Sequence, residues 1–366
     1  MANEVKKVNT IAIADIKNIN TLTDDNIKNL NTLEFTGIVY PSWAGSRAVI
    51  YGGVSINESE QTTPSTAYIL YKTIASDGNA AEFDEAQNGR EGGKGSGSNG
   101  TRAVWGGGWS RTEANGSSTL GVEQMDYVTV ASTNSALDFG NLNNPTGYGG
   151  SDGASNGTLA FFNGGRSSGG YQNDMEYVTI SSTGSVGTGG DLEANQAYHS
   201  TSNGDSKYLI MGGRLSSPST KLDTVSQNSF STSASATDFG AVGQFAMYYS
   251  AVACSTTRVV VAGGGGIDDI HYFSPASAVD SVDDGYSILA PLYWISGTSD
   301  GTTGEFFGGE GDSSVNHHVN YIQKITIASL ANATDAGDLA HPDFDWDEHT
   351  YSQAGGASRM NSQSGT

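Results

Sequence analysis

Two acidic groups contain the side chains of this 366-residue chain that are best suited to chemistry. They are Asp343, Asp345, Asp347, Glu348 and His349 near the C-terminal end, and Asp280, Asp283 and Asp284 earlier in the chain. Clustered oxygen ligands suit hard cations such as Ca²⁺, but neither group has the glycine and the distal glutamate of an EF-hand loop. Chance clusters are also expected where 39 residues are acidic and 17 are basic. The sequence therefore predicts no metal site.

The histidine and cysteine residues give no stronger indication of a metal site or a catalytic site. His317 and His318 are adjacent, so their side chains would point to opposite sides of a strand, and a solvated loop is the simpler expectation. Cys254 is the single cysteine and lies in an apolar run, where a buried, inert thiol is the common outcome. One cysteine cannot form an intrachain disulfide, so folding does not require an oxidising compartment.

Two glycine-containing motifs resemble parts of nucleotide-binding enzymes. Asp138-Phe139-Gly140 and Asp238-Phe239-Gly240 match a kinase magnesium motif, but they lie 100 residues apart (238 − 138), and no catalytic loop or lysine-bearing strand accompanies them. Residues 259–266 match the strand and glycine turn of a dinucleotide fold, but residues 267–272 predict no helix to face a pyrophosphate. We therefore predict no catalytic residue and no cofactor.

Both motifs belong to a longer repeat, whose units contain a short apolar run that ends in Gly-Gly. The first glycines of these pairs are Gly52, Gly106, Gly164, Gly212, Gly263 and Gly308. They lie 54, 58, 48, 51 and 45 residues apart, an average of (308 − 52)/5, or about 51. Each run is too short for a helix and rich in β-forming residues, so it predicts a strand buried on both faces.

Three further elements recur around each Gly-Gly strand. A second strand is clear at 126–132, 176–182 and 324–329, but is reduced to 229–232 in unit four and 271–274 in unit five. A third element with the pattern Ala-Leu/Thr-Asp-Phe-Gly follows, for example at 136–140, and a fourth precedes the Gly-Gly strand, for example at 198–202. Four short strands in each of six units predict an all-β chain, with a six-bladed β-propeller over residues 37–366.

The blade that joins the two ends of the ring has two candidate closing strands. One is the N-terminal segment 38–43 and the other is the C-terminal segment 349–356. Closure by either one would remove an exposed sheet edge, and the sequence does not choose between them.

A different repeat, with a period of 11 residues, occupies the predicted anchor segment 1–36. Apolar residues at offsets 0, 3 and 6 would share one face of a helical turn, and the period suits a right-handed stripe. Asn and Thr are poor helix formers, so we predict short helical turns broken by loops. An apolar stripe left unpaired would stay exposed, so we expect it to dock on a partner or on copies of itself. The predicted anchor residues are Val5, Val8, Ile11, Ile16, Ile19, Leu22, Ile27, Leu30 and Leu33.

The Gly-Gly strand, the Tyr-Val-Thr-Ile/Val-Ala/Ser-Ser strand and the Ala-Thr-Asp-Phe-Gly turn, repeated at about 50 residues, resemble kelch-like repeats. More closely, they look like propeller-type structural proteins of marine and cyanobacterial tailed phages, which carry N-terminal Ile-Lys-x-Ile-Asn repeats. The resemblance covers residues 5–33 and 46–340, and departs in unit five and at 82–84 and 190–192.

The resemblance implies a non-enzymatic virion component made in the host cytoplasm, such as a capsid decoration, fibre or tail-associated subunit. Its expected partners are capsid, neck or tail proteins, other copies of itself and a host-surface glycan or protein. The net charge of −22 argues against binding nucleic-acid phosphates or an anionic membrane surface. The first residues lack the apolar core of a secretory signal, and no apolar stretch approaches the length of a membrane span.

Two other functions are open. A carbohydrate-binding adhesin would use Tyr and Trp at loop tips, and loops 110–121 and 169–173 are candidates to carry them. A galactose-oxidase-like copper enzyme or a hydrolase would use the same scaffold, but no residue pair supports catalysis, and fold alone does not confer it. Of the tryptophans Trp43, Trp105, Trp109, Trp294 and Trp346, we expect Trp105 to pack between blades.

Overall fold

The computed structural model describes most of the chain from residue 46 to residue 339. The described ranges are 46–53, 65, 67–74, 76–111, 118–149, 154–184, 186–204, 206–217, 219–231, 233–243, 247–311 and 319–339, together with six two-residue strands within 7–34. The chain divides into two compact units, Met1–Pro41 and Ser42–Thr366. All regular elements in the described ranges are strands, so these ranges contain no helix of the length and apolarity needed to span a membrane.

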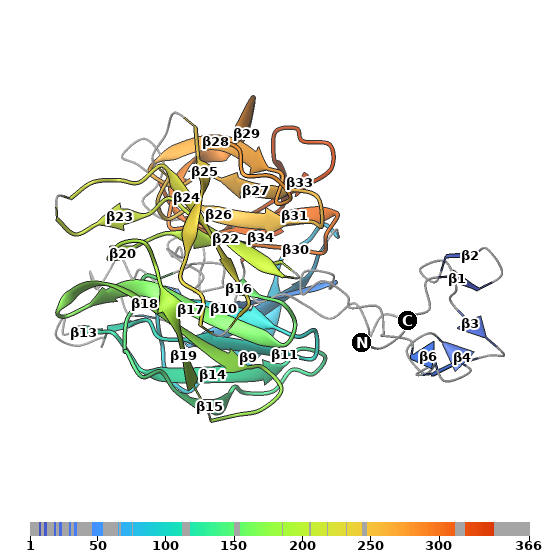
Figure 1. The fold of residues 1–366 in the computed structure, drawn as a ribbon, viewed down its shortest axis with the longest axis horizontal. Helices are drawn as coiled ribbons and strands as arrows, with labels where there is room; N and C mark the ends of the chain where they lie inside the picture. The colour runs from blue at the N-terminus through green and yellow to red at the C-terminus, as the bar shows by residue number, and fades with distance from the viewer. Residues whose placement is uncertain are drawn as a thin grey trace. The chain divides into compact units, whose positions relative to one another are not determined.

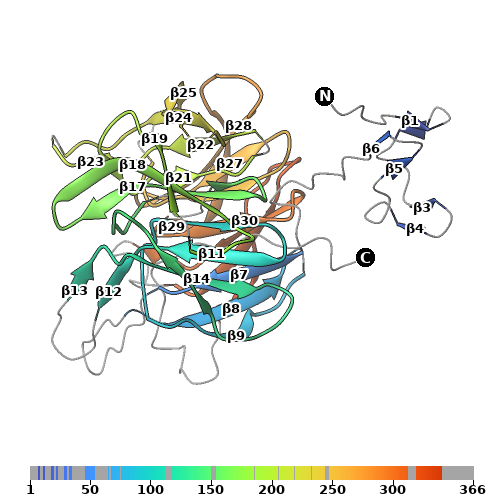
Figure 2. The same ribbon diagram turned by 60° about the horizontal axis from the view of Figure 1, so that its bottom comes forward.

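Six antiparallel sheets in the described part of the second unit form the blades of a β-propeller (Figures 1 and 2). Blade A contains β7 (Arg47–Tyr51), β8 (Tyr68–Thr73) and β9 (Ala81–Glu85). Blade B contains β10 (Gly95–Ser98), β11 (Arg102–Gly106), β14 (Gln124–Thr129) and β15 (Leu137–Asn141). Blade C contains β16 (Ala154–Ser155), β17 (Leu159–Ser167), β18 (Gly170–Thr179) and β19 (Val186–Asp191).

The remaining blades repeat this plan. Blade D contains β21 (Ser200–Thr201), β22 (Lys207–Met211), β24 (Thr224–Ser229) and β25 (Thr237–Ala241). Blade E contains β26 (Ala251–Cys254), β27 (Val259–Ala262), β28 (Ile267–Phe273) and β29 (Val282–Tyr293), and β32 (Glu310–Gly311) pairs with the end of β29. Blade F contains β30 (Ser296–Ser299), β31 (Thr303–Phe307), β33 (Tyr321–Thr326) and β34 (Thr334–Asp338). The predicted all-β, six-bladed fold is confirmed.

Each four-stranded blade is a meander whose first strand is the innermost. The residues of β10, β26 and β30 are all buried, whereas outermost strands such as β15 are largely exposed. The innermost strands of neighbouring blades also contact one another. In blades B to F, the central axis of the propeller is therefore lined by the segment that precedes the Gly-Gly strand.

The Gly-Gly pairs have left-handed backbones, with one change of register. In blade B the positive-φ pair is Gly107 and Gly108, one residue later than predicted, because Gly106 lies within β11 and pairs with Gly95. A Cβ atom at Gly106 would lie 2.8 Å from the Phe162 ring of blade C. This third glycine therefore allows close packing between two blades.

The structure differs from the prediction at three elements of the repeat. The Asp-Phe-Gly segments are not turns, since they lie in outermost strands such as β15 and β25. In unit four the strand that follows the Gly-Gly strand is β24, which lies upstream of the predicted 229–232. In unit five the corresponding strand is β28, which has seven residues and is not reduced. β24 is mostly polar, so propensity does not identify it, but pairing on both sides fixes it.

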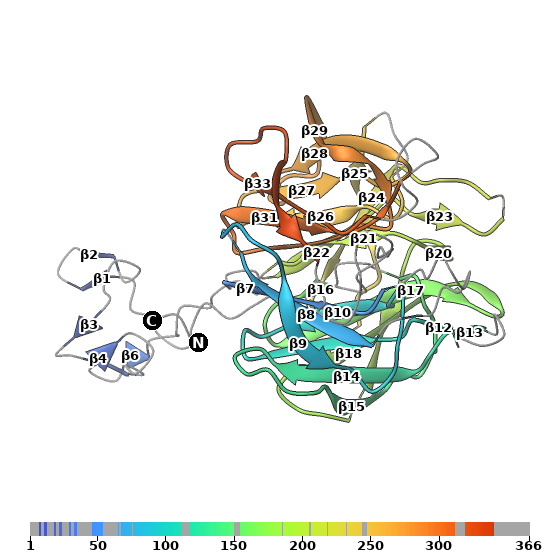
Figure 3. The same ribbon diagram turned by 180° about the vertical axis from the view of Figure 1, so that it is seen from behind.

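Six apolar clusters join each blade to the next. The cluster that closes the ring packs Phe307 and Ile322 of blade F against Ile50 and Leu70 of blade A. Figure 3 shows blade A between blades F and B, in agreement with these contacts. The two candidates for the strand that completes blade A, 38–43 and 349–356, lie outside the described residues.

The first unit contains three small antiparallel ladders in its described strands. They are β1 (Lys7–Val8) with β2 (Ile11–Ala12), β3 (Asn18–Ile19) with β4 (Leu22–Thr23), and β5 (Asn29–Leu30) with β6 (Leu33–Glu34). The prediction of helical turns is therefore wrong. Two residues, Asn-Thr in each repeat, separate the paired strands, and this is the commonest hairpin connection, at which Asn is favoured.

Six of the predicted anchor residues lie in these strands, and three lie outside the described residues. The Cα partners across the ladders are Val8 with Ile11, Ile19 with Leu22, and Leu30 with Leu33. The three-residue offset that suggested a helix is thus the distance around a hairpin. Val5, Ile16 and Ile27 lie outside the described residues, and docking by this segment stays a prediction.

Candidate recognition site

One end of the propeller carries most of its additional structure. In a four-stranded meander, the connection from strand two to strand three and the connection to the next blade leave from the same end. The hairpin β12 (Trp109–Arg111) with β13 (Ser118–Leu120), the tip of β17–β18, and the pair β20 (Gln196–Ala197) with β23 (Arg214–Leu215) all lie there (Figures 1 and 3).

Four aromatic residues at this end have left-handed backbones. Tyr148, Tyr198, Tyr249 and Trp294 have φ of 56°, 66°, 62° and 59°, and they are the non-glycine residues with positive φ in the described ranges. The equivalent residue before blade B is Gly92, with φ of 55°. The left-handed conformation costs an L-residue roughly 1–2 kcal/mol, and glycine avoids this cost. A large aromatic side chain at four of these positions therefore needs a reason beyond backbone geometry.

Backbone hydrogen bonds link these residues around the axis. The Tyr148 N–H donates to the Gly92 carbonyl (2.5 Å), the Tyr198 N–H to the Tyr148 carbonyl (2.7 Å), and the Tyr249 N–H to the Tyr198 carbonyl (2.9 Å). Each bond joins one blade connection to the next. The left-handed turn directs these backbone groups toward the neighbouring blade, so the surrounding ring maintains the strained conformation.

The side chains of these residues pack together into one cluster, which we call the aromatic mouth. Its members are Tyr148, Tyr198, Tyr249, Trp294, Trp109, Tyr171 and Tyr248. Ring centroids are 4.4 Å apart for Tyr198 and Tyr249 and 5.2 Å apart for Tyr148 and Trp294. Tyr148 and Tyr198 are buried, whereas the other members are half-buried. The mouth thus has a rigid centre and accessible aromatic surface around it.

Hydroxyl groups give the mouth hydrogen-bonding capacity. The Tyr198 hydroxyl accepts from an Arg166 guanidinium nitrogen (3.2 Å), and the Tyr148 hydroxyl donates to Glu91 (3.2 Å). Burial raises the pKa of Tyr171 to about 12 and also raises the pKa of Tyr249, and the neighbouring Tyr198 acts in the same direction on both. These phenols therefore stay protonated near neutral pH and remain donors.

Polar groups beneath the mouth connect the innermost strands. Ser200 Oγ contacts Ser250 Oγ (2.8 Å), and Ser299 Oγ donates to the Cys254 carbonyl (2.8 Å). His199, directly after Tyr198, is fully buried, and neither ring nitrogen has a hydrogen-bond partner in the described ranges. Burial lowers the pKa of His199 to about 3, so this ring is neutral at physiological pH.

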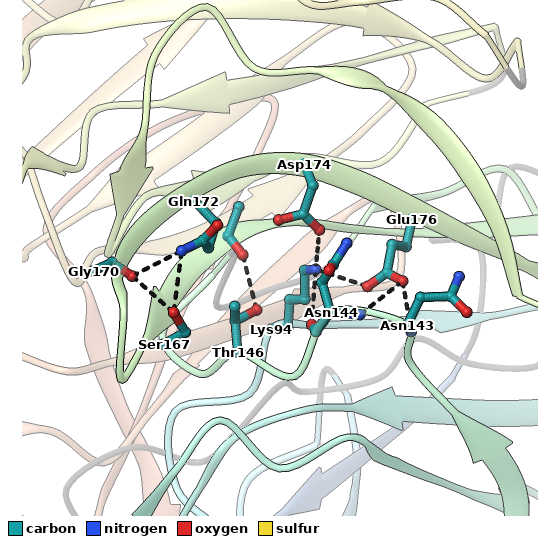
Figure 4. Close-up of polar contacts among 10 residues, drawn as sticks. Lys94, Asn143, Asn144, Thr146, Ser167, Gly170, Gln172, Asp174 and Glu176 are labelled. Atoms are coloured by element: carbon teal, nitrogen blue, oxygen red, sulfur yellow. Dashed lines mark hydrogen bonds and ion pairs between the residues drawn. The ribbon is translucent and has the colours of Figure 1, made fainter.

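A buried ionic cluster surrounds Lys94 (Figure 4). Lys94 Nζ, which is inaccessible to solvent, donates to Asp174 (2.5 Å) and Glu176 (2.8 Å) of β18. Glu176 also accepts from the backbone N–H groups of Asn143 (2.7 Å) and Asn144 (3.2 Å). The cluster therefore ties the connection that leads to Tyr148 onto blade C. The sequence does not reveal it, because its members come from three separate elements.

The acidic groups singled out from the sequence do not form this site. Asp280 accepts from the Ala241 N–H at the end of β25 (3.0 Å), and Asp283 accepts from the Gly285 N–H two residues away (2.7 Å), so both bind backbone groups. Residues 343–349 and 317–318 lie outside the described residues. In the described ranges, no three His, Cys, Asp or Glu side chains gather as metal ligands would. Cys254 is buried on β26, as predicted.

The aromatic residues were only partly anticipated. Trp105 packs between blades A and B, edge-on to Tyr51 at 5.4 Å, which confirms its prediction. Of the two candidate loops, 169–173 contributes Tyr171 to the mouth, whereas Tyr148, Tyr198 and Tyr249 were missed. Their signal was available, since a Tyr or Trp recurs shortly before the innermost strand at intervals of 50, 51 and 45 residues (148, 198, 249 and 294).

No protein-family model matches this chain, and a search of curated proteins finds no match to it either.

Proposed function

We propose that this chain is a non-enzymatic phage virion subunit that attaches to the particle by residues 1–36 and binds a host-surface glycan through the aromatic mouth of its propeller. The kelch-like and phage assignments rest on the repeat motifs of the sequence. The recognition role rests on the mouth itself.

The left-handed aromatic residues are the observation that carries this proposal. Glycine would relieve the backbone at Tyr148, Tyr198, Tyr249 and Trp294, yet each position has an aromatic ring, and several rings remain partly exposed. Strained residues that are held by the surrounding structure cluster at ligand sites. Half-buried Tyr and Trp offer a flat apolar face together with a polar group, which matches the apolar ring faces and hydroxyls of a sugar.

Attachment through the N-terminal repeats is supported by their size and composition. Each described ladder has two residues per strand, and an isolated two-stranded hairpin is marginally stable at best in water. Three such hairpins with paired apolar positions gain stability by packing on another surface. The net charge of −22 suits a subunit that must not associate nonspecifically through its propeller.

A glycan array probed with the full chain tests the recognition role. The unmodified chain is expected to bind at least one glycan class, and Y249A/W294A is expected to lose at least tenfold in apparent affinity. Y272A is the matched control, because Tyr272 is also a half-buried aromatic but lies under Arg258 in blade E, outside the mouth. Absence of glycan binding by the full chain, or equal binding by Y249A/W294A, would overturn the proposal.

A further inference from the structure

We infer that the aromatic mouth is specific for saccharides that bear an acidic group, which is bound by Arg166 and Arg214. This inference rests on the proposed glycan recognition and adds the chemical class of the ligand.

Arg166 is held rigidly at the edge of the mouth. It lies on β17 opposite Tyr171 of β18, and its backbone exchanges two hydrogen bonds with Gly147 (2.6 and 3.0 Å) in the neighbouring connection. One guanidinium nitrogen donates to the Tyr198 hydroxyl (3.2 Å). The remaining donors of the guanidinium fork are not bonded to a carboxylate in the described ranges.

Arg214 lies close to Tyr198 on the β20–β23 pair, outside the blades. It lies on β23 opposite Ala197, the residue before Tyr198. Its guanidinium group donates to the Ser219 hydroxyl, and its Nε is buried without a hydrogen-bond partner in the described ranges. Burial raises the pKa of Tyr171, and the positive charges of Arg214 and Arg166 act to lower it. Lys221 forms a bridge with Arg214 through the backbone, and its ammonium group lies 4.7 Å from the centre of the Tyr248 ring. Cations therefore lie beside aromatic rings of the mouth.

The cations elsewhere in the described propeller have structural partners. Lys72, Arg90, Lys94 and Lys324 form ion pairs with carboxylates. Arg47, Arg102 and Arg258 stack on tyrosines and donate to carbonyl groups of the next blade. Arg166, Arg214 and Lys221 likewise meet no carboxylate in the described ranges, and their side-chain partners are the hydroxyl groups of Tyr198 and Ser219 and the ring of Tyr248. Their charges at the mouth are therefore not neutralised by an ion pair, although acidic residues outnumber basic ones by more than two to one.

This arrangement favours an anionic group on a sugar ring. The planar guanidinium fork matches the geometry of a carboxylate or sulfate and binds it through charge-assisted hydrogen bonds. The protonated phenols of Tyr171 and Tyr249 add neutral donors beside it. The half-buried rings of Tyr248 and Trp294 provide the apolar surface for the rest of the saccharide. A neutral sugar would leave the two guanidinium groups without an anionic partner.

An array printed with matched acidic and neutral glycans tests this inference on the full chain. The pairs are a galacturonan oligosaccharide and its carboxyl-reduced form, sialyllactose and lactose, and a sulfated and an unsulfated galactan. We expect at least a tenfold preference for the acidic member of one pair, and the responding pair distinguishes a carboxylate from a sulfate. R166Q/R214Q should lose this preference. As a control, K324Q removes a positive charge from the Lys324–Asp77 pair between blades F and A. This variant should retain the preference for acidic glycans.

The outcomes separate this inference from the proposed function. Equal binding of acidic and neutral members overturns the acidic specificity but leaves glycan recognition intact, and an acidic preference that survives in R166Q/R214Q overturns the assignment to these residues. Absence of all binding overturns both proposals. Because β20–β23 lies outside the blades, R214Q alone gives the same test if the double variant does not fold, with a thermal unfolding curve as the check.

Discussion

At the scale of single residues, the central feature is a conflict between backbone and side chain. Tyr148, Tyr198, Tyr249 and Trp294 adopt the left-handed conformation that glycine adopts at the equivalent Gly92. Backbone hydrogen bonds between neighbouring connections hold them in place. The side chains are therefore retained against a local energetic cost, and they form the surface that we assign to recognition.

Substitution of Tyr249 separates this backbone cost from the contribution of the ring. Both Y249A and Y249G lose the aromatic packing, but only alanine keeps a Cβ at φ of 62°. Y249G is expected to be more stable than Y249A by about 1 kcal/mol, since relief of left-handed strain outweighs the greater flexibility of unfolded glycine. Urea unfolding midpoints of the two variants check this, and an alanine variant at least as stable as the glycine variant would contradict it.

Because His199 is buried, the free energy of unfolding depends on pH in the acidic range. Burial lowers the pKa of His199 from its ordinary 6.5 to about 3, so between these values the unfolded chain binds a proton that the folded chain excludes. Stability is then lost as the pH falls below 6.5. Between pH 7 and pH 5 the unmodified chain should lose about 2 kcal/mol more than H199L. Chemical unfolding at both pH values measures the difference, and parallel changes in the two proteins would refute the assignment.

The burial of single residues could be predicted from the sequence where it follows from their position in the repeat unit. Trp105 and Cys254 lie in Gly-Gly or innermost strands, so their burial follows from their place in the unit. The partners of Lys94 could not be predicted, because Asp174 and Glu176 are 80 and 82 residues away in sequence and become neighbours only when two blades pack. The two acidic groups were singled out as candidate metal sites only because their carboxylates are close together in the sequence.

At the scale of elements, strand pairing overrides local propensity in both units of the chain. β24 forms from the polar sequence of residues 224–229 because strands pair with it on both sides. The N-terminal repeats form two-residue ladders around Asn-Thr, although their apolar spacing also fits a helical turn. A three-residue offset between apolar positions is compatible with either structure, so periodicity alone could not decide between them.

Deletion of residues 1–36 tests the anchor at this scale. Because the apolar clusters of the propeller begin at Ala48, the truncated chain should retain its far-UV circular dichroism and thermal midpoint. It should no longer co-sediment with virion particles, whereas the full chain should. A second variant with Val8, Ile19 and Leu30 replaced by Asn should behave like the deletion. Particle association that persists without residues 1–36 would refute the anchoring role.

At the scale of the whole molecule, the propeller is a closed ring of similar interfaces. Six apolar clusters connect six blades, and the last joins blade F to blade A. The 50-residue period predicted this architecture, because a single blade is too small to bury its apolar faces alone. The buried pair of Lys72 and Glu305 at the closing interface, 233 residues apart in sequence, was not predictable from any unit.

The closing interface should weaken as the pH rises. Burial raises the pKa of Glu305 from 4.5 to about 7, and this effect outweighs the opposing effect of Lys72. The folded chain therefore retains a proton that the unfolded chain releases above pH 4.5, and stability is lost as the pH rises through 7. From pH 5 to pH 8 the unmodified chain should lose about 2 kcal/mol relative to E305Q. Unfolding curves that shift equally for both proteins would show that Glu305 is already ionised at pH 5.

The most direct test of the account is a tryptophan fluorescence titration of the full chain with the glycan that binds best on the array. Trp294 lies in the aromatic mouth, whereas Trp105 is buried between blades A and B. Ligand binding at the mouth should change the emission of the unmodified chain and of W105F, with at least half of that change absent in W294F. A full change in W294F, or its loss in W105F, would place the ligand away from the mouth and contradict the account.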